Sequence, residues 1–175
     1  MRKWVYIIFF TCVGLTSCEK ENTEELLESE DLLASQEYFR AKINGKDFEV
    51  TDPENMRGFV YPDPRSEIMT FDLIGWREEG DDYEELNFKI CFYDGPGIYY
   101  TGVTTSVSWA DYYKNWDTWF NDPLLEDPGQ VVVEEQTENF ISGTFQFNAY
   151  SYEIESFVYV EGEFKVLLEK SVYED

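Results

Sequence analysis

The fold class of this chain is decided by Phe39-Arg40-Ala41-Lys42-Ile43-Asn44-Gly45-Lys46-Asp47-Phe48-Glu49-Val50. Apolar and polar residues alternate on both sides of Asn44-Gly45, which is the period of a strand with one buried face. The apolar positions of this pattern are Phe39, Ala41, Ile43, Phe48 and Val50. An Asn-Gly pair favours a two-residue type I′ turn, because both positions of that turn need a positive φ. The stretch therefore predicts a β-hairpin.

The same period-two pattern of aromatic and β-branched residues continues along the chain, interrupted by Gly, Pro, Asn and Asp. It predicts further strands over residues 57–61, 67–76, 84–93, 97–101, 130–135, 140–150 and 156–168. Gly162 predicts a bend or bulge in the last of these. About nine or ten short strands in one domain predict an all-β fold, a single antiparallel sandwich or barrel.

The chain is strongly acidic. Its 175 residues include 37 Asp and Glu against 13 Lys and Arg, which gives a formal net charge of −24. This charge repels nucleic-acid phosphates, so we expect no nucleic-acid partner. The absence of histidine from the sequence excludes Ser-His-Asp and Cys-His catalytic sets and imidazole-ligated zinc. We expect a protein that is not an enzyme, with no catalytic residues, no metal and no cofactor.

The N-terminus has the layout of a secretory signal. Residues 2–3 are basic, residues 4–13 form an apolar run too short to span a bilayer, and residues 14–17 form a small-residue approach to a cleavage point. The sequence Leu15-Thr16-Ser17-Cys18 resembles the lipobox of bacterial lipoproteins, which implies that Cys18 is diacylated and becomes the first residue of the mature chain. An ordinary secretory signal and an uncleaved anchor are the alternatives.

The sequence divides into a signal peptide over residues 1–17, a lipidated cysteine with an acidic tether over 18–37, and a β domain over 38–175. Residues 19–37 have no aromatic residue and no glycine and cannot build a core, so they predict a solvated spacer. The start of the tether, Cys18-Glu19-Lys20-Glu21-Asn22, resembles the surface-export signal of Bacteroidota lipoproteins. That resemblance implies anchoring in the outer membrane through the lipid on Cys18 and display at the surface, with the periplasmic face as the alternative.

Aromatic residues concentrate in residues 108–120, which hold three of the five tryptophans of the chain. Read as a short helix capped by Ser108, the segment puts its aromatic residues on one broad stripe. Read as two strands with a turn near Lys114-Asn115, it is a hairpin, and periodicity does not separate these alternatives. The candidate ligand-binding residues are Trp109, Tyr112, Tyr113, Trp116 and Trp119. Exposed rings among Asp and Asn side chains suit a carbohydrate platform, whereas packing in the core is the alternative that we favour.

Three other features carry weaker signals. Cys91 has no histidine to activate it, so we expect an inert thiol. The acidic loop Glu78-Glu79-Gly80-Asp81-Asp82 is compatible with Ca²⁺, but its spacing does not match a calcium-binding loop, and we favour a solvated hairpin tip. Asp72 lies between Phe71 and Leu73 and is the one candidate for a perturbed pKa, although an outward-facing strand position is the simpler interpretation.

Several segments carry a family resemblance. They are Phe39-Arg40-Ala41-Lys42-Ile43-Asn44-Gly45-Lys46, Gly97-Ile98-Tyr99, Gly129-Gln130-Val131-Val132-Val133, Phe140-Ile141-Ser142-Gly143-Thr144-Phe145-Gln146-Phe147-Asn148-Ala149 and Val160-Glu161-Gly162-Glu163-Phe164-Lys165-Val166. They resemble a family of small Bacteroidota lipoproteins of unknown function. The resemblance implies an all-β domain and transfers no catalytic residue. The aromatic segment and the acidic loop depart from the pattern, so a role specific to this chain is expected there.

The sequence leaves several functions open. The first is a lipid-anchored, non-enzymatic binding or interaction module of the cell envelope, with a glycan or a protein as its ligand. The second is a glycan-binding accessory or a glycoside hydrolase, because two carboxylates alone can cleave a glycosidic bond. The third is a purely structural envelope protein.

Overall fold

A computed structural model describes residues 37–103, 107–124 and 129–169. The described residues belong to one compact unit, and the signal peptide, Cys18 and residues 19–36 of the tether lie outside the described residues. The strands are β1 (Tyr38–Ile43), β2 (Lys46–Val50), β3 (Met56–Pro62), β4 (Met69–Glu79), β5 (Asp82–Cys91), β6 (Gly97–Thr101), β7 (Trp109–Lys114), β8 (Asp117–Phe120), β9 (Gly129–Gln136), β10 (Phe140–Ser151) and β11 (Ser156–Glu169). The short 3₁₀ helix Pro53–Asn55 is the one helix in this part of the chain, and it is far too short to cross a membrane.

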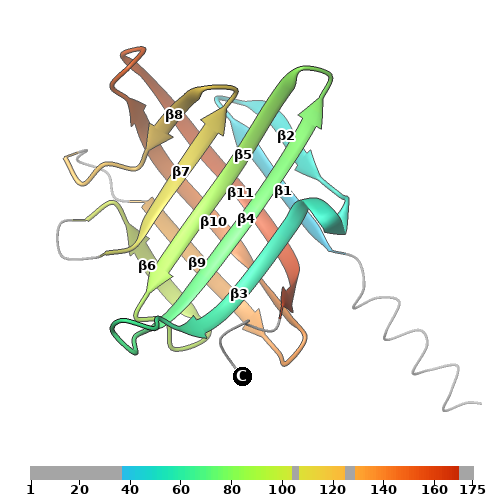
Figure 1. The fold of residues 1–175 in the computed structure, drawn as a ribbon, viewed down its shortest axis with the longest axis vertical. Helices are drawn as coiled ribbons and strands as arrows, with labels where there is room; N and C mark the ends of the chain where they lie inside the picture. The colour runs from blue at the N-terminus through green and yellow to red at the C-terminus, as the bar shows by residue number, and fades with distance from the viewer. Residues whose placement is uncertain (1–36, 104–106, 125–128, 170–175) are drawn as a thin grey trace, which may run out of the picture. The chain divides into compact units, whose positions relative to one another are not determined.

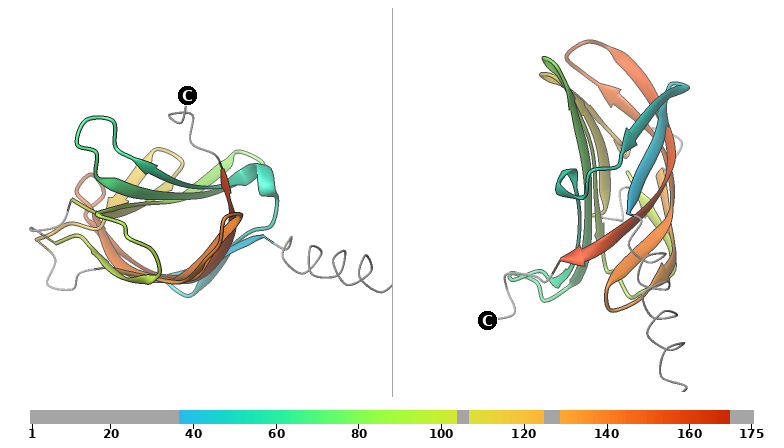
Figure 2. Two further views of the ribbon diagram at one scale, coloured as in Figure 1. Left: turned by 90° about the horizontal axis from the view of Figure 1, so that it is seen from below. Right: turned by 90° about the vertical axis from the view of Figure 1, so that its right-hand side faces the viewer.

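The strands form one sheet in the order β2-β1-β11-β3-β4-β5-β7-β8-β10-β9-β6, and an additional β10–β11 pairing joins its two halves. Figures 1 and 2 show that the sheet curls into two facing layers, one containing β3, β4, β5, β7 and β8 and the other containing β1, β11, β10 and β9. The all-β prediction is confirmed. The number of strands is slightly larger than predicted, and β11 runs parallel to β3 in a short contact at Leu168 and Gly58, whereas the other pairings are antiparallel.

The first hairpin forms as predicted. Asn44 and Gly45 have φ values of 49° and 79°, as a type I′ turn requires. The Asn44 side chain also accepts a hydrogen bond from the Tyr159 backbone N–H at 2.8 Å, so the turn is tied to β11. The apolar positions of both strands face inward and are buried. Burial of every second residue is therefore the physical reason that this sequence forms strands.

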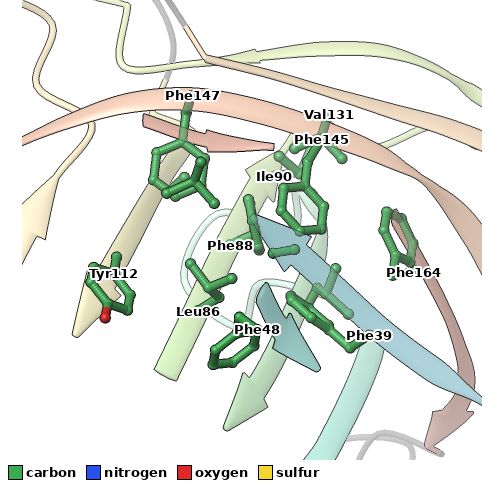
Figure 3. Close-up of a cluster of buried hydrophobic side chains, with 14 of the residues drawn as sticks. Phe39, Phe48, Leu86, Phe88, Ile90, Tyr112, Val131, Phe145, Phe147 and Phe164 are labelled. Carbon is green, nitrogen blue, oxygen red and sulfur yellow. The ribbon is translucent and has the colours of Figure 1, made fainter. Parts of the chain in front are cut away.

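The core lies between the two layers and is rich in aromatic rings, which pack among aliphatic side chains (Figure 3). Phe88 from β5 and Phe145 from β10 approach to 4.6 Å between ring centroids, and Phe39 lies 5.3 Å from Phe145. All three side chains are buried. Because phenylalanine rings fill the space between the layers, ligand sites must be sought at the ends and on the outer faces of the sheet.

Two glycines of the closing strands have different roles. The β9–β10 register shifts between Ser142 and Gly143, so the chain has an irregularity of the β-bulge type at Gly143. At Gly162 the pairing with both neighbours is regular, so the predicted bulge is absent. A Cβ at Gly162 would lie 2.2 Å from the Arg40 carbonyl oxygen and 2.5 Å from the Phe145 ring. Gly162 is therefore required for close approach of the chains.

The inward pattern of β5 ends at Ile90, although the alternation of apolar residues in the sequence continues to Phe92. Leu86, Phe88 and Ile90 are fully buried, but Phe92, the next apolar residue of this alternation, is exposed. Its φ of 59° turns the chain after Cys91, and Tyr93 becomes the next buried residue. A left-handed backbone conformation thus interrupts the period-two alternation.

Candidate functional site

The aromatic segment is a β-hairpin, so the helical alternative for residues 109–120 is wrong. Strands β7 and β8 pair antiparallel, and Asn115, with a φ of 56°, lies in the turn between them. The Asn115 side chain accepts a hydrogen bond from the Tyr83 N–H at 3.0 Å and donates one to Asp82 at 3.2 Å, which fixes this turn against the neighbouring β4–β5 hairpin. Strand geometry then separates the aromatic residues onto two faces.

Two of the candidate residues point inward. Tyr112 and Trp119 are 3% and 7% exposed and stack with 5.2 Å between their centroids and 30° between their planes. The Tyr112 hydroxyl donates to Glu84 at 2.8 Å, and the Trp119 indole N–H donates to the Ser156 hydroxyl at 2.8 Å. The structure therefore places these rings in the core, as the packing alternative expects.

The remaining candidates are more accessible, but they do not form one platform. Trp109 is 37% exposed near the start of β7, and Trp116 is 89% exposed in the hairpin turn. Tyr113 is half-buried and packs edge-to-face on Tyr83 at 5.6 Å. Tyr113 and Trp116 line a hollow of about 550 Å³ at the hairpin tips, whereas Trp109 belongs to a separate groove.

That groove, here called the outer-face groove, has a volume of about 510 Å³. It is lined by Trp109, Ala110, Asp111, Phe120, Asn121, Asp122, Pro123 and Tyr152. Asp111 and Phe120 are direct partners in the β7–β8 ladder, so their side chains share one face. Tyr152 comes from the turn between β10 and β11 and reaches the groove because β10 pairs with β8 at Tyr150 and Phe120. Three aromatic rings and three short polar side chains thus meet at one surface.

Hydrogen bonds hold the polar wall of this groove in place. The buried Asn121 accepts a hydrogen bond from the Thr101 hydroxyl at 2.6 Å and donates one to the Asn148 carbonyl at 2.8 Å. Asp122 accepts hydrogen bonds from the Tyr152 hydroxyl and from the Leu124 N–H, the latter at 2.7 Å. The hydrogen bond between the Tyr152 hydroxyl and the Asp122 carboxylate holds both side chains in position. The groove therefore has its binding geometry before any ligand enters.

The Asp111 carboxyl has an unusual protonation equilibrium. Burial in the groove, followed by the negative charge of Glu85, raises the pKa of Asp111 to about 7. The group is therefore partly protonated near neutral pH and can both donate and accept hydrogen bonds. The hydrogen bond to Asp122 similarly raises the pKa of the Tyr152 hydroxyl, which remains a donor.

Exposed rings continue beyond the groove toward β11. Tyr150 lies 4.5 Å from Phe157 and 4.8 Å from Tyr152 between ring centroids, and the Tyr150–Tyr152 contact is edge-to-face. Phe157 and Tyr152 are both exposed. A ligand longer than the groove would therefore meet further aromatic surface along this direction.

The other features of the sequence lie elsewhere. Gly80 and Asp81 form the tip of the β4–β5 hairpin, and no cluster of three or more His, Cys, Asp or Glu suited to a metal occurs in the described residues. The Asp72 carboxylate accepts a hydrogen bond from the Tyr61 hydroxyl at 2.6 Å, while its other oxygen is buried without a partner among the described residues. Burial raises the pKa of the half-buried Cys91 thiol, which disfavours the reactive thiolate.

Sequence reasoning missed several groove residues. Asp111 and Phe120 lie in the aromatic segment, and strand alternation from Trp109 would have placed Asp111 on the same face. Tyr152 lies far along the chain and carries no local signal, because its position depends on the β8–β10 pairing.

A family model described as a domain of unknown function, DUF6252, matches residues 78–167, which is just over half of the chain. The match spans the end of β4 through most of β11 and so includes every residue of the outer-face groove. Neither the curated proteins nor the solved structures returned a match.

Proposed function

We propose, given that this chain belongs to the DUF6252 family of domains of unknown function, that it is a lipid-anchored, non-enzymatic binding module of the bacterial cell envelope. Its outer-face groove holds a carbohydrate ligand. The observation that carries this proposal is the meeting of the Trp109, Phe120 and Tyr152 rings with Asp111, Asn121 and Asp122 in a single groove.

The groove chemistry suits a sugar. Flat aromatic rings cover the apolar C–H faces of a pyranose, and amide and carboxyl groups bond its hydroxyls. The proposal is supported by the fixed positions of Asn121 and Asp122, because prearranged polar groups lower the entropic cost of binding. A partly protonated Asp111 adds both a donor and an acceptor.

Glycan retention by the purified protein tests this role. We expect the wild-type protein to retain at least one glycan on an array, and Trp109→Ala and Phe120→Ala to weaken that binding at least about tenfold. Trp116→Ala is the matched control, because it removes a more exposed ring that lies outside the groove. Equal loss in Trp109→Ala and Trp116→Ala, or no glycan retained by the wild type, would contradict the proposal.

The membrane attachment rests on the N-terminal sequence. A lipobox-like Leu15-Thr16-Ser17-Cys18 would supply two or more acyl chains, which suffice for stable anchoring in the outer membrane. The acidic tether would then hold the domain away from the lipid, facing the cell exterior. Labelled fatty acid should enter the wild-type protein and not Cys18→Ala, and label in Cys18→Ala would exclude this anchor.

Hydrolysis of the bound glycan is the second candidate, and one observation favours it. Asp111, with its raised pKa, and Asp122 line the same groove, and an acid with a second carboxylate is the minimal set for cleaving a glycosidic bond. Release of reducing sugar that is lost in Asp111→Asn would assign this activity. Retention without release supports the non-enzymatic module.

A further inference from the structure

A second cavity, distinct from the outer-face groove, carries an unusual charge arrangement. It has a volume of about 450 Å³ and lies where the ends of β4, β5 and β7 approach the first hairpin. Arg77, Lys114 and Lys46 line it together with Glu84, and Tyr112 and Trp119 form part of its wall. We call it the cationic cavity. It shares no residue with the outer-face groove.

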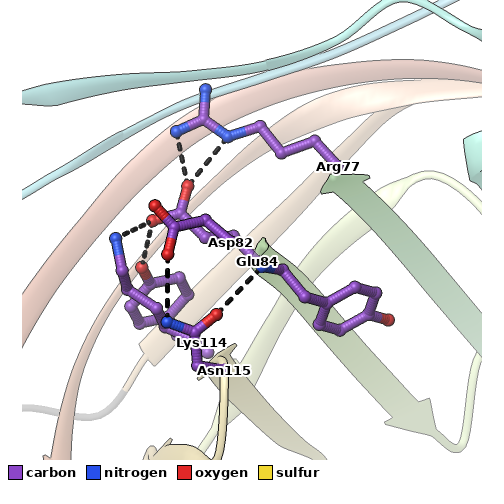
Figure 4. Close-up of polar contacts among 7 residues, drawn as sticks. Arg77, Asp82, Glu84, Lys114 and Asn115 are labelled. Atoms are coloured by element: carbon purple, nitrogen blue, oxygen red, sulfur yellow. Dashed lines mark hydrogen bonds and ion pairs between the residues drawn. The ribbon is translucent and has the colours of Figure 1, made fainter. Parts of the chain in front are cut away.

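Glu84 joins the cations of this cavity in one network of polar contacts (Figure 4). Its side chain is only 10% exposed, and both of its oxygens accept hydrogen bonds. Arg77 Nε donates to Oε2 at 2.8 Å, and Arg77 Nη2 donates to the same oxygen. Lys114 Nζ and the Tyr112 hydroxyl each donate to Oε1 at 2.8 Å. One carboxylate therefore serves two cations and a hydroxyl.

The cavity has more positive than negative charge. Glu84 neutralises one of the charges of Arg77 and Lys114, and Lys46 adds another. The second acidic residue of the lining, Asp47, pairs with Lys42 at 2.6 Å, outside this network. An excess of positive charge is notable in a chain with a formal net charge of −24. Such a cavity attracts an anion, because partly buried charges are stabilised by pairing.

The cations are also positioned to bind a further group. Glu84 uses two of the five N–H donors of the Arg77 guanidinium and one of the three donors of Lys114. The Arg77 guanidinium lies 4.9 Å from the centroid of the buried Phe48 ring, which limits its movement. Donors held in this way match the oxygens of a carboxylate or phosphate.

We propose that the cationic cavity binds a small organic anion, whose carboxylate or phosphate group bridges Arg77 and Lys114 beside Glu84. The walls contributed by Trp119, Ile43 and Val158 then contact the less polar part of the ligand. Because the core between the sheet layers is filled by aromatic rings, the ligand is confined to this cavity and is of the size of one sugar ring or a short organic acid.

Titration calorimetry of the full-length protein in detergent with glycerate, glycerol 3-phosphate and glycerol tests the proposal. These probes share a three-carbon skeleton without a sugar ring, so the outer-face groove does not compete for them, and they differ in charge. Glycerate or glycerol 3-phosphate should bind while glycerol does not, and the stronger of the two identifies the preferred group. Lys114→Met should weaken that binding at least about tenfold. Lys165→Met, the same charge change on another strand, should leave it unchanged.

Glu84→Gln provides an independent variant, because it removes the carboxylate that competes for both cations. It should bind the anion more tightly than the wild type. No binding by either anion, equal binding of glycerol, equal effects of Lys114→Met and Lys165→Met, or weaker binding by Glu84→Gln would each overturn the proposal. If Lys114→Met does not fold, the wild-type titration and Glu84→Gln still decide it.

Discussion

The indole N–H of Trp119 donates to the Ser156 hydroxyl at 2.8 Å and so joins β8 to the first residue of β11, although these two strands do not pair in the sheet. Trp119 also stacks on Tyr112. One face of the β7–β8 hairpin thus packs in the core and stabilises the fold, whereas the other face lies at the surface.

Replacing Trp119 should therefore affect stability far more than replacing Trp116. Trp119→Ala removes a buried ring and leaves a cavity, so the free energy of unfolding should fall by about 3–5 kcal/mol. Trp116→Ala should change it by less than about 0.5 kcal/mol, since its ring is exposed. Urea unfolding measured by circular dichroism checks both values, and equal destabilisation would contradict the placement of the two rings.

The contribution of the hydrogen bond itself can be separated from that of the ring. Ser156→Ala leaves the N–H of the buried Trp119 without this acceptor and should cost about 1–3 kcal/mol. The same unfolding measurement applies. A Ser156→Ala protein as stable as the wild type would show that water replaces the Ser156 hydroxyl.

Features that a short stretch of sequence specifies by itself were predictable. Asn44-Gly45 and its flanking alternation specify a hairpin locally, and that hairpin forms. In residues 109–120 aromatic residues occupy inward and outward positions alike, so hydrophobicity does not reveal the strand period. The choice between helix and hairpin depends on pairing with β5, which brings Lys89 opposite Trp109 and is not encoded within the segment.

The candidate sites were still harder to predict. In the outer-face groove, Tyr152 is placed by closure of the sheet through β8 and β10. In the cationic cavity, Arg77, Glu84 and Lys114 come from three strands, and each looks like an ordinary solvated charge in the sequence. Side chains that meet through long-range strand pairing carry no short-range signal.

Gly143 should tolerate no side chain. A Cβ there would lie 2.0 Å from the Val132 carbonyl oxygen, which is backbone and cannot rotate away. Gly143→Ala should destabilise the protein by on the order of 3 kcal/mol. Gly97→Ala is the control, because its Cβ would meet only the Tyr99 ring at 3.7 Å, and it should change stability by less than about 1 kcal/mol. Thermal unfolding of both variants tests the prediction, which equal midpoints would contradict.

Because the Asp111 carboxyl loses its proton more readily in the unfolded chain, the free energy of unfolding should fall as the pH rises from about 4 to 7. In the unfolded chain its pKa is near 3.8, whereas in the groove it is about 7. The folded state therefore binds more protons across this window, and stability falls until the pH exceeds the folded pKa. Asp111→Asn should remove this slope and be more stable than the wild type at pH 8. Unfolding curves at pH 5 and pH 8 measure it, and an unchanged slope in Asp111→Asn would assign the effect to other groups.

Glu84 should make the protein less stable as the pH falls below about 4.5, which is the opposite direction to the effect of Asp111. Burial acts to raise its pKa, but the hydrogen bonds from Lys114, Arg77 and Tyr112 outweigh burial and lower the pKa from 4.5 to about 2. The charged carboxylate thus stabilises the fold above pH 4.5, and this contribution disappears as the pH falls toward 2. The lost stability is on the order of 3 kcal/mol.

Glu84→Gln isolates this contribution. It should destabilise the protein at pH 7, because Arg77 and Lys114 lose their buried anion, and the difference from the wild type should shrink as the pH is lowered from 4.5 to 2. Glu79→Gln is the control, since Glu79 is exposed at the hairpin tip and should leave the acid dependence unchanged. Urea unfolding at pH 7, 4 and 2.5 gives the comparison. A constant difference between Glu84→Gln and the wild type across these pH values would show that the carboxylate is not held in its charged form by the two cations.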